Sequence, residues 1–578
     1  QVKCDKRPGR CMQCERLQLD CFGSSEEAVE SLVNGRSSAR VEKRTRTYRS
    51  CNQCRSSKLK CSGERPKCRR CAARSIACVY DTDSAPAWIR SIEQSTRRNN
   101  EPREESTMSA EAENSESNDL GIREDGLYSW LFSRALPSVP LRRRLAEQYF
   151  NHHHPLRCFG FIHKPSFMQR LDEDKLSSKA ELALLYIVCA IGVKFYALHA
   201  RQDQYQLSLK QVQLAGSQWA KQATSMILGD YGNISIENLM ATLLLHDYEI
   251  GSGNHAQAFL LSALTARMAS ALQINLEYST DILYVGESRG APSAVEREER
   301  RRLMWACYDI DTWNGSGVEQ LTLLNETDIK IQLPCNSRDF LHGRPTITQN
   351  LQSPQDLEFI TPVSMPIASS ESLGIIAHYI RLVAIWKRIL RYFKHLDEAA
   401  APWLPDSEFS NIESDLRRWK NDLPESLQWN ASSIYIRRES SQLGALLVLN
   451  CIYHQTVYDL YRIGLPELFN IREHLHFPLE QKEYQERARL ECFNNAQQIA
   501  VILSTALQHG ADVLADTKLP SLTYNANRVM LYYLARYISP NSQESQRILA
   551  ETVKHIKGNN EALRAMSPLF PLALALVW

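Results

Sequence analysis

Six cysteines between Cys51 and Cys78 constrain this chain more than any other feature of its sequence. They repeat the spacing C-x2-C-x6-C twice, with six residues between the halves, in the order Cys51, Cys54, Cys61, Cys68, Cys71 and Cys78. Thiolates at this spacing suit zinc, which takes four sulfur ligands in a tetrahedron. Six thiolates close two tetrahedra only if two sulfurs bind both metals. We therefore expect two Zn²⁺ ions in a complete cluster.

A small disulfide scaffold is the alternative interpretation of these cysteines, and it requires an oxidising compartment. No export signal is visible in the sequence. Eight basic residues and a single acid, Glu64, lie between Cys51 and Cys78. The other cysteines after residue 78 are scattered singly, as reduced core cysteines are: Cys158, Cys189, Cys307, Cys335, Cys451 and Cys492. The pattern favours zinc in a reducing compartment.

This segment resembles the fungal binuclear zinc cluster, Zn2Cys6, which is a DNA-binding module. The resemblance implies that Cys51 and Cys68 are the bridging ligands. The stretch from Arg55 to Lys60 matches the helix of the family that reads DNA, and Lys58 occupies its base-contacting position. Pro66 matches the proline of the loop between the halves. The resemblance also implies CGG-like triplets, read in the major groove, as the target.

The charge of the chain is divided between its two ends. Residues 1–80 contain 19 Lys and Arg against 8 Asp and Glu, a net charge of +11, whereas the remainder carries −9. A basic arm with Arg44, Arg46 and Arg49 leads directly into Cys51. Basic segments beside a DNA-binding module neutralise phosphates. We therefore expect Lys60 and the arm to contact the DNA backbone.

Residues 1–22 resemble the C-terminal part of a first, incomplete Zn2Cys6 cluster. Their cysteines have the spacings x6, x2 and x6, which are the last four positions of the pattern above: Cys4, Cys11, Cys14 and Cys21. One bridging ligand is missing from this set, so it can hold at most one zinc ion. Gln1 stands at the position that corresponds to Lys58. A degenerate copy that binds no metal is the alternative.

Composition and periodicity divide the rest of the chain. We expect a linker with the basic arm at 23–50, the zinc module at 51–80 and a disordered linker, rich in Ser, Glu, Asn and Arg, at 81–126. From 127 to 578 the apolar residues follow a helical period, and strand-like alternation is nearly absent. Ser235 should cap one helix and Glu296–Trp313 should form another, with further helices in 371–396, 410–420, 440–462, 483–508 and 522–537. The predicted fold is all-α, a large helical domain preceded by small zinc-stabilised modules.

Several phrases of this helical part resemble the fungal-specific transcription factor domain, a regulatory domain that commonly follows a zinc cluster. They are YFNHHHPLRCFGFIHKPSF (149–167), ALTARMASALQINLE (263–277), EREERRRLMWACYDIDTW (296–313), DIKIQLPC (328–335) and WKNDLP (419–424). Their order and spacing together carry the resemblance. It implies that the helical part is a regulatory domain.

No set of residues indicates catalysis. His152, His153, His154 and His163 lack the i, i+4 pair of a helical metal site, so packing is the favoured interpretation. Gly251–Ala256 fits a dinucleotide-binding pattern formally, but a helix rather than a strand precedes it, which favours a helix–helix turn. Asp309 and Asp311, two residues apart on one helix, point in different directions and are expected to form caps or ion pairs. We predict that the chain is not an enzyme.

The sequence therefore predicts a fungal, RNA polymerase II type transcription regulator that works in the nucleus. Double-stranded DNA is the expected partner, together with the transcription machinery or coregulators. A small-molecule effector is a further candidate, and no membrane is expected. Two alternatives remain: a helical enzyme or ligand-receptor domain that the cluster tethers to chromatin, and a zinc scaffold that binds protein. Target genes, the effector and the choice between activation and repression do not follow from the sequence.

Overall fold

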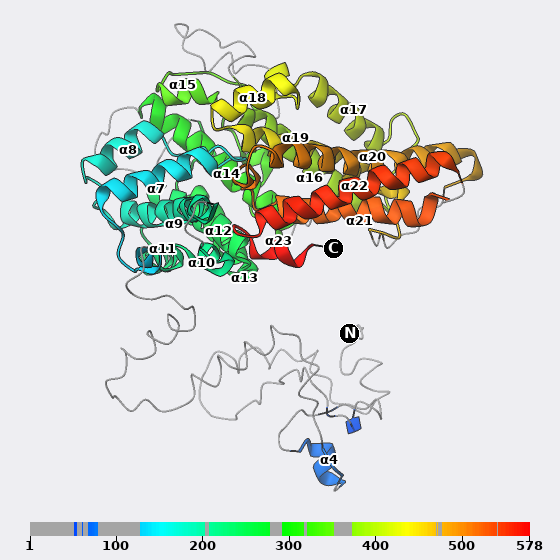
Figure 1. Cartoon of the computed structure of the whole chain (residues 1–578), viewed down its shortest axis with the longest axis horizontal. Coiled ribbons are helices and arrows are strands. Elements are labelled where there is room, and N and C mark those ends of the chain that lie inside the picture. The colour runs from blue at the N-terminus through cyan, green and yellow to red at the C-terminus, as the bar shows by residue number, and fades with distance from the viewer. Residues whose placement is uncertain are drawn as a thin grey trace, which may run out of the picture. The chain divides into compact units, whose positions relative to one another are not determined.

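A computed structural model describes the chain at residues 51, 53–54, 61, 67–74, 76–78, 128–202, 207–277, 292–316, 321–351, 373–469, 471, 477–539 and 542–577. The chain divides into two compact units, 1–109 and 110–578, and each is treated by itself. In the first unit the described residues include one short helix, α4 (Arg69–Ala73). The second unit is a large helical body (Figure 1).

The described part of the body consists of α-helices with a few short 3-10 helices among them. The first half contains η1 (Ser129–Phe132), α7 (Val139–His152), α8 (Lys164–Asp172), α9 (Lys179–Gln202), α10 (Leu209–Leu214), α11 (Ser217–Leu228), α12 (Ile236–Ser252), α13 (His255–Ala271), α14 (Ala294–Gly315), η3 (Glu326–Asp328) and α15 (Ser337–Leu341). The second half contains α16 (Ile375–Lys394), α17 (Glu408–Asn421), η5 (Glu425–Leu427), α18 (Ala431–Glu439), α19 (Leu443–Tyr461), η6 (Arg462–Gly464), η7 (Leu479–Gln481), α20 (Lys482–Leu507), η8 (Ala511–Leu514), α21 (Leu519–Tyr537), α22 (Gln543–Met566) and α23 (Pro571–Ala575).

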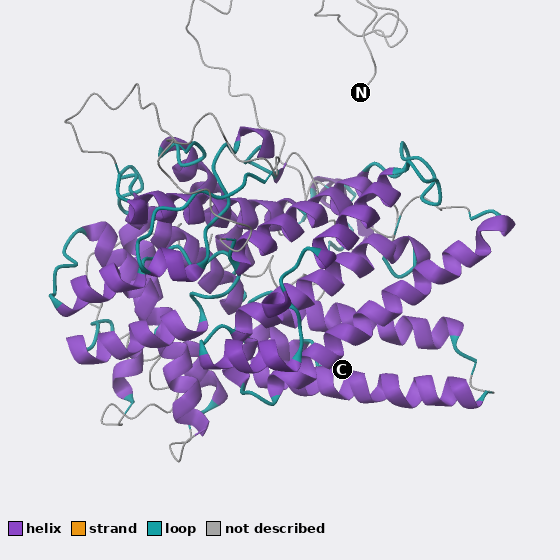
Figure 2. Cartoon of the chain, turned by 90° about the horizontal axis from the view of Figure 1, so that it is seen from above, coloured by secondary structure: helices purple, strands orange, loops and turns teal. Residues whose placement is uncertain are grey.

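The described part of the body contains no β-strand, and its extended segments form two isolated β-bridges (Figure 2). One of these bridges pairs Leu276 with Lys330, and the other pairs Cys335 with Leu373. The predicted all-α fold class is therefore confirmed.

Helix α9 lies at the centre of the first half, where it packs against α7, α11 and α12. The close approach to α7 depends on Gly192, because a Cβ atom there would lie 2.0 Å from the carbonyl oxygen of Leu145. The apolar stretch of α9, Lys179–Arg201, is long and apolar enough to cross a membrane, but 78% of its 18-residue apolar window is buried inside the body. Helix α9 is therefore a core helix of the body.

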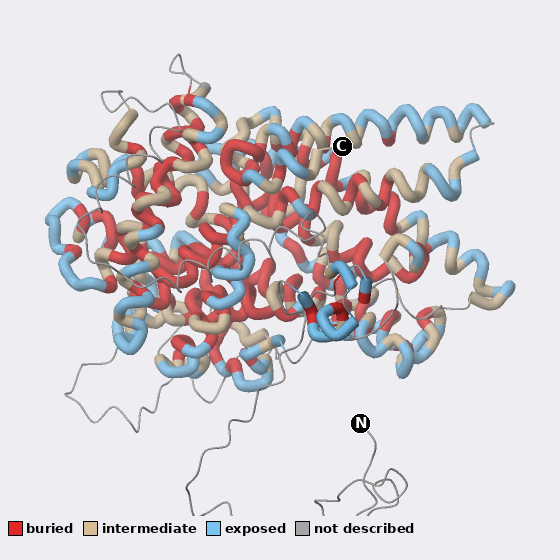
Figure 3. The backbone as a smooth tube through the Cα atoms, turned by 90° about the horizontal axis from the view of Figure 1, so that it is seen from below, coloured by how far each residue is buried: buried red, intermediate tan, exposed pale blue. Residues whose placement is uncertain are grey.

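In the second half α20 is the central helix, and α19, α21 and α22 pack against it. Helix α16 joins the halves, since it contacts both α14 and α19. One large hydrophobic core runs through both halves, from Leu131 to Ala573, and a small second cluster contains Ile434, Leu443 and Leu446. Figure 3 shows this core as a continuous buried interior, with the first turns of α22 exposed at its edge.

Most predicted helices are found close to their expected positions. The side chain of Ser235 accepts a hydrogen bond from the Asn238 amide and caps α12, and Gly253, at φ 85°, ends that helix before α13 begins. The helix–helix turn at Gly251–Ala256 is therefore confirmed. Helix α14 begins two residues earlier than predicted, because Ser293 forms a capping box with Glu296. The sequence interpretation did not place α22.

Candidate metal centre

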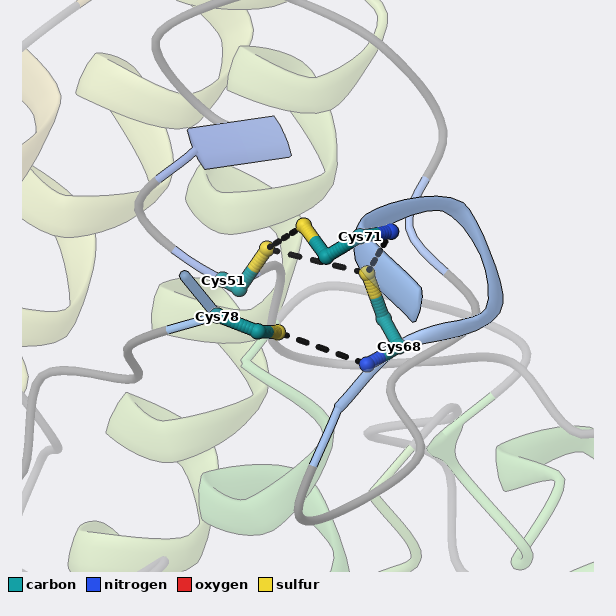
Figure 4. A group of neighbouring side chains, drawn as sticks. All are labelled: Cys51, Cys68, Cys71 and Cys78. Atoms are coloured by element: carbon teal, nitrogen blue, oxygen red, sulfur yellow. Dashed lines mark hydrogen bonds between the residues drawn. The ribbon is translucent and has the colours of Figure 1, made fainter. Parts of the chain in front are cut away.

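The described cysteines of the first unit form two sets of four sulfurs. One set is Cys51, Cys54, Cys61 and Cys68, and the other is Cys51, Cys68, Cys71 and Cys78. Within each set all four sulfurs lie within 4.8 Å of one another. The two sets share Cys51 and Cys68, whose sulfurs are 3.8 Å apart. Figure 4 shows the second set, with the sulfurs of Cys51, Cys68 and Cys71 turned toward one another.

The spacing of these sulfurs fits zinc rather than disulfides. The distances are 3.7 Å between Cys51 Sγ and Cys71 Sγ and 3.8 Å between Cys54 Sγ and Cys68 Sγ. A zinc ion bound to four sulfurs at about 2.3 Å sets them about 3.8 Å apart in a regular tetrahedron, whereas a disulfide needs about 2.05 Å. None of the described cysteines is in a disulfide. The donor set therefore fits two tetrahedral zinc ions that share two ligands.

The backbone positions the shared sulfurs in the same way in both halves of the cluster. The amide of Cys54 donates to Cys51 Sγ at 3.4 Å, and the amide of Cys71 donates to Cys68 Sγ at 3.5 Å. Cys68 is thereby the N-cap of α4. An amide that donates to a sulfur stabilises the thiolate form, which is the form that binds metal.

The remaining contacts shift the pKa values of the individual thiols in different directions. The Cys68 amide donates to Cys78 Sγ at 3.3 Å and holds the pKa of Cys78 below its usual range. Burial among the other thiols raises the pKa of Cys71. Six thiolates around two zinc ions leave a formal charge of roughly −2. Arg70 partly compensates for it, because its Nη1 atom lies 3.7 Å from Cys54 Sγ.

The residues expected to touch DNA lie outside the described residues. These are Arg44, Arg46, Arg49, Arg55, Lys58 and Lys60. The cysteines of the first, incomplete cluster also lie outside them: Cys4, Cys11, Cys14 and Cys21. The predicted DNA contacts and the first cluster therefore stay predictions.

The histidines of the 152–163 segment do not assemble into a site of their own. His154 Nε2 pairs with the carbonyl of Ile162 at 2.9 Å, and His163 pairs with Ser166 and with the carbonyl of Leu341. His152 differs, because its Nδ1 lies 3.3 Å from Asp512, beside His199. Packing is therefore the role of His154 and His163. His152, His199 and Asp512 instead have their ligand atoms within 4.8 Å of one another, a spacing at which they could hold a metal ion, and burial lowers the pKa of His152.

Asp309 and Asp311 have the structural roles that their spacing predicts. Asp309 accepts a hydrogen bond from the hydroxyl of Tyr379 at 2.9 Å and lies 3.4 Å from Arg157 Nη1. Asp311 points to another side, where its carboxylate accepts from the backbone amides of Leu323 and Leu324. One carboxylate joins a buried ion cluster and the other caps a loop.

Arg157 is the residue that sequence reasoning missed. Its buried guanidinium contacts three carboxylates, with Nη2 at 2.5 Å from Asp247, Nε at 2.6 Å from Asp516 and Nη1 facing Asp309. Burial alone would raise the pKa of Asp247, but the charges of Arg157 and His153 outweigh it and hold that pKa below the usual value. A lone arginine inside a histidine-rich phrase gives no sign of this, because its partners lie up to 359 residues away.

A comparison with known protein families finds a match in each of the two units. Residues 49–86 match the fungal Zn(2)-Cys(6) binuclear cluster domain, and residues 146–421 match the fungal specific transcription factor domain. The chain contains both domains of the fungal Zn2Cys6 transcription factors. In this family the zinc cluster domain binds zinc, which agrees with the two sulfur sets.

The relatives carry names of the same kind. A transcriptional regulatory protein of Schizosaccharomyces pombe, described as uncharacterized, is 29% identical over 333 residues, which are 57% of this chain and 33% of that protein. The Zn(2)-C6 fungal-type transcription factor FTF1c of Fusarium oxysporum is 25% identical over 547 residues, which are 82% of this chain and 56% of the relative. The chain thus spans a third to somewhat over half of the length of these relatives.

Proposed function

We propose that this chain is a sequence-specific DNA-binding regulator of RNA polymerase II transcription that acts in the nucleus. One observation carries the proposal: two four-sulfur sets that share Cys51 and Cys68. Two zinc ions with shared ligands fold a segment that is too short to bury a core of its own. The names of the relatives and the net charge of +11 on residues 1–80 support the same function.

In this proposal the zinc ligands are the six cysteines from Cys51 to Cys78. Lys58 reads the bases of a CGG-like triplet in the major groove. Arg55, Lys60 and the basic arm neutralise phosphates, which gives affinity without sequence preference. The helical body regulates this activity and contacts coregulators or the transcription machinery. Cys4, Cys11, Cys14 and Cys21 belong to a further cluster that precedes the basic arm.

Fluorescence anisotropy of the full chain on labelled duplexes tests this assignment. Replacing Lys58 by Ala should cost about 1–3 kcal/mol on a CGG duplex and reduce the discrimination against a scrambled duplex. Lys60→Ala is the matched control, because loss of a phosphate contact should weaken both duplexes about equally and flatten the salt dependence. Equal losses for Lys58→Ala on the two duplexes would refute the role of Lys58 in base reading.

A ligand-receptor role of the helical body is the second candidate, and it adds to DNA binding rather than replacing it. A specific observation favours it: a cavity between the two halves of the body with a largely buried lysine in its wall. Within the described residues, the carboxylates of Asp309 and Asp311 are engaged in structural contacts, which gives no support to a helical enzyme.

A further inference from the structure

The helical body contains a cavity that is lined mainly by apolar side chains. Its volume is about 40 Å³, and about 370 Å³ when the open space at its mouth is included. Phe195, Tyr248 and Phe570 are among its apolar walls, and Lys194, His153 and Asp247 are its charged or polar members. The walls come from α9, α12 and the segment before α23, so the cavity joins parts of the chain that are distant in sequence.

Lys194 is buried in this wall without an anionic partner. The residue is 8% exposed, and within the described part of the chain its ammonium makes neither a hydrogen bond nor an ion pair. Its close contact is the ring of Tyr248, 4.3 Å from Nζ to the ring centroid. Burial lowers the pKa of Lys194 to about 8, against the charges of Glu249 and Asp247, so the amine is still largely protonated at neutral pH. Lys194 Nζ is not fully buried, so the ammonium is open to the cavity, where an anion can approach it.

A second polar group at the cavity is also unsatisfied. His153 Nε2 is buried and has no hydrogen-bond partner in the structure, since the nearest carboxylate oxygen, of Asp247, is 3.8 Å away. Asp247 itself is occupied, because Oδ1 accepts from Arg157 and from the hydroxyl of Thr517. The cavity therefore presents one free cation and one free imidazole nitrogen beside aromatic walls.

We propose that this cavity binds a small, mostly apolar carboxylate, with its carboxylate group on Lys194 and its apolar part against Phe195 and Phe570. A carboxylate on Lys194 Nζ forms charge-assisted hydrogen bonds, which are the strong ones. The small volume restricts the ligand to a short chain or a single ring. This inference rests on the proposed regulatory role of the helical body, for which the carboxylate would be the effector. Its test measures ligand binding and does not depend on DNA binding.

The bound ligand would touch both ends of the body. Lys194 and Asp247 lie in the part that matches the fungal specific transcription factor domain, whereas Thr517 and Phe570 lie in the C-terminal part beyond residue 421. Asp247 also belongs to the Arg157 ion cluster, which lies against the same wall. Occupation of the cavity would therefore stabilise the contact between these two parts.

Thermal unfolding and saturation-transfer NMR of the full chain test the proposal with butyrate, hexanoate and benzoate as probes. We expect at least one of them to bind saturably and to raise the unfolding temperature. The matched neutral amides should bind weaker by about tenfold or more, because they lack the charge that Lys194 pairs with. Absence of saturable binding by all three acids, or equal binding of acids and amides, would overturn the proposal.

Two variants and one control locate the site. Lys194→Met keeps the apolar stem and should abolish acid binding while leaving the ligand-free chain as stable as before or more stable. Gly251→Ala adds a methyl group 3.3 Å from Phe570 and Thr517 and should weaken binding by narrowing the cavity. Lys221→Met, at an exposed position of α11, is the control and should bind as the unchanged chain does. Acid binding that survives both Lys194→Met and Gly251→Ala would place the ligand elsewhere and refute the site.

Discussion

Arg157 Nε lies 2.6 Å from Asp516 Oδ2, although 359 residues separate the two in sequence. This contact fastens the C-terminal part of the helical body to the segment that begins the family's regulatory domain. The same guanidinium also pairs with Asp247 on α12 and faces Asp309 on α14. One buried arginine thus connects elements from both halves.

Removal of Arg157 should be strongly destabilising. Arg157→Met leaves three buried carboxylates without the cation that contacts them, so the free energy of unfolding should fall by about 3–5 kcal/mol. Arg388→Met is the matched control, because Arg388 pairs with Asp415 at a side chain that is 44% exposed and should contribute about 0–1 kcal/mol. Urea denaturation followed by circular dichroism measures both values. Equal losses for the two variants would contradict the central role of Arg157.

Gly192 should resist substitution even though it lies inside a helix. Gly→Ala in a helix interior ordinarily stabilises by about 0.5–1 kcal/mol. A methyl group on Gly192 meets the backbone of Leu145 at 2.0 Å, so α9 would have to move away from α7. Gly192→Ala should therefore destabilise the body by about 1–3 kcal/mol or more. Gly232→Ala, where a Cβ atom has no neighbour within 4 Å, is the control in the same denaturation experiment, and a stabilised Gly192→Ala chain would refute the close approach of the two helices.

Buried histidines should make the body sensitive to acid. Burial lowers the pKa of His153, His246 and His378 to about 4 each, whereas the unfolded chain has the ordinary value of about 6.5. Between pH 4 and about 6.5 the unfolded state therefore binds more protons than the folded state. The contribution of these histidines to the free energy of unfolding is fully present above a pH of about 6.5 and declines as the pH falls toward 4. Denaturation midpoints across this range should show the decline.

A variant checks the source of this pH dependence. His246→Gln removes one buried imidazole and should make the decline shallower by at most about 1.4 kcal/mol per pH unit. His342→Gln replaces an exposed histidine and is the control. If the curves of both variants run parallel to that of the unchanged chain, His246 does not contribute to the decline.

Local signals in the sequence predicted much of this fold. Ser235 caps α12 because a short hydroxyl side chain satisfies a free amide at a helix start, and Gly253 ends α12 in the left-handed region. The directions of Asp309 and Asp311 followed from helical geometry. Such features depend on neighbours within a few residues, which a sequence displays directly.

The ion cluster and the cavity could not be predicted in this way. Arg157 and Lys194 are each single basic residues within apolar or mixed segments, and their surroundings come from α12, α14 and the segment before α21. Neither periodicity nor spacing records which distant helix will lie against such a side chain. In the metal centre the spacing predicted two metals, and the family resemblance supplied the bridging pair, which agrees with the two residues shared by the sulfur sets.

Because the two sulfur sets differ in their members, replacing a cysteine of one set should lower the zinc content, whereas replacing a cysteine outside both sets should not. Cys61 belongs only to the set with Cys51, Cys54 and Cys68, so Cys61→Ala removes one ligand of one tetrahedron. Metal analysis of the purified chain should then find at least one zinc ion fewer, together with loss of the folded module. Cys492→Ala, a buried cysteine of the helical body, is the control and should keep the zinc content. Unchanged zinc in Cys61→Ala would contradict the assignment of that set.

The most direct test of the account is the affinity of the full chain for a CGG duplex when one shared ligand is removed. Cys51 belongs to both sulfur sets, whereas Cys451 is a buried cysteine of α19 with no part in them. We predict that Cys51→Ser loses both zinc ions of the 51–78 cluster and binds CGG and scrambled duplexes alike, while Cys451→Ser retains the preference for CGG. A Cys51→Ser chain that binds the CGG duplex as tightly and as selectively as the unchanged chain would contradict the claim that a two-zinc cluster on shared thiolates reads the DNA.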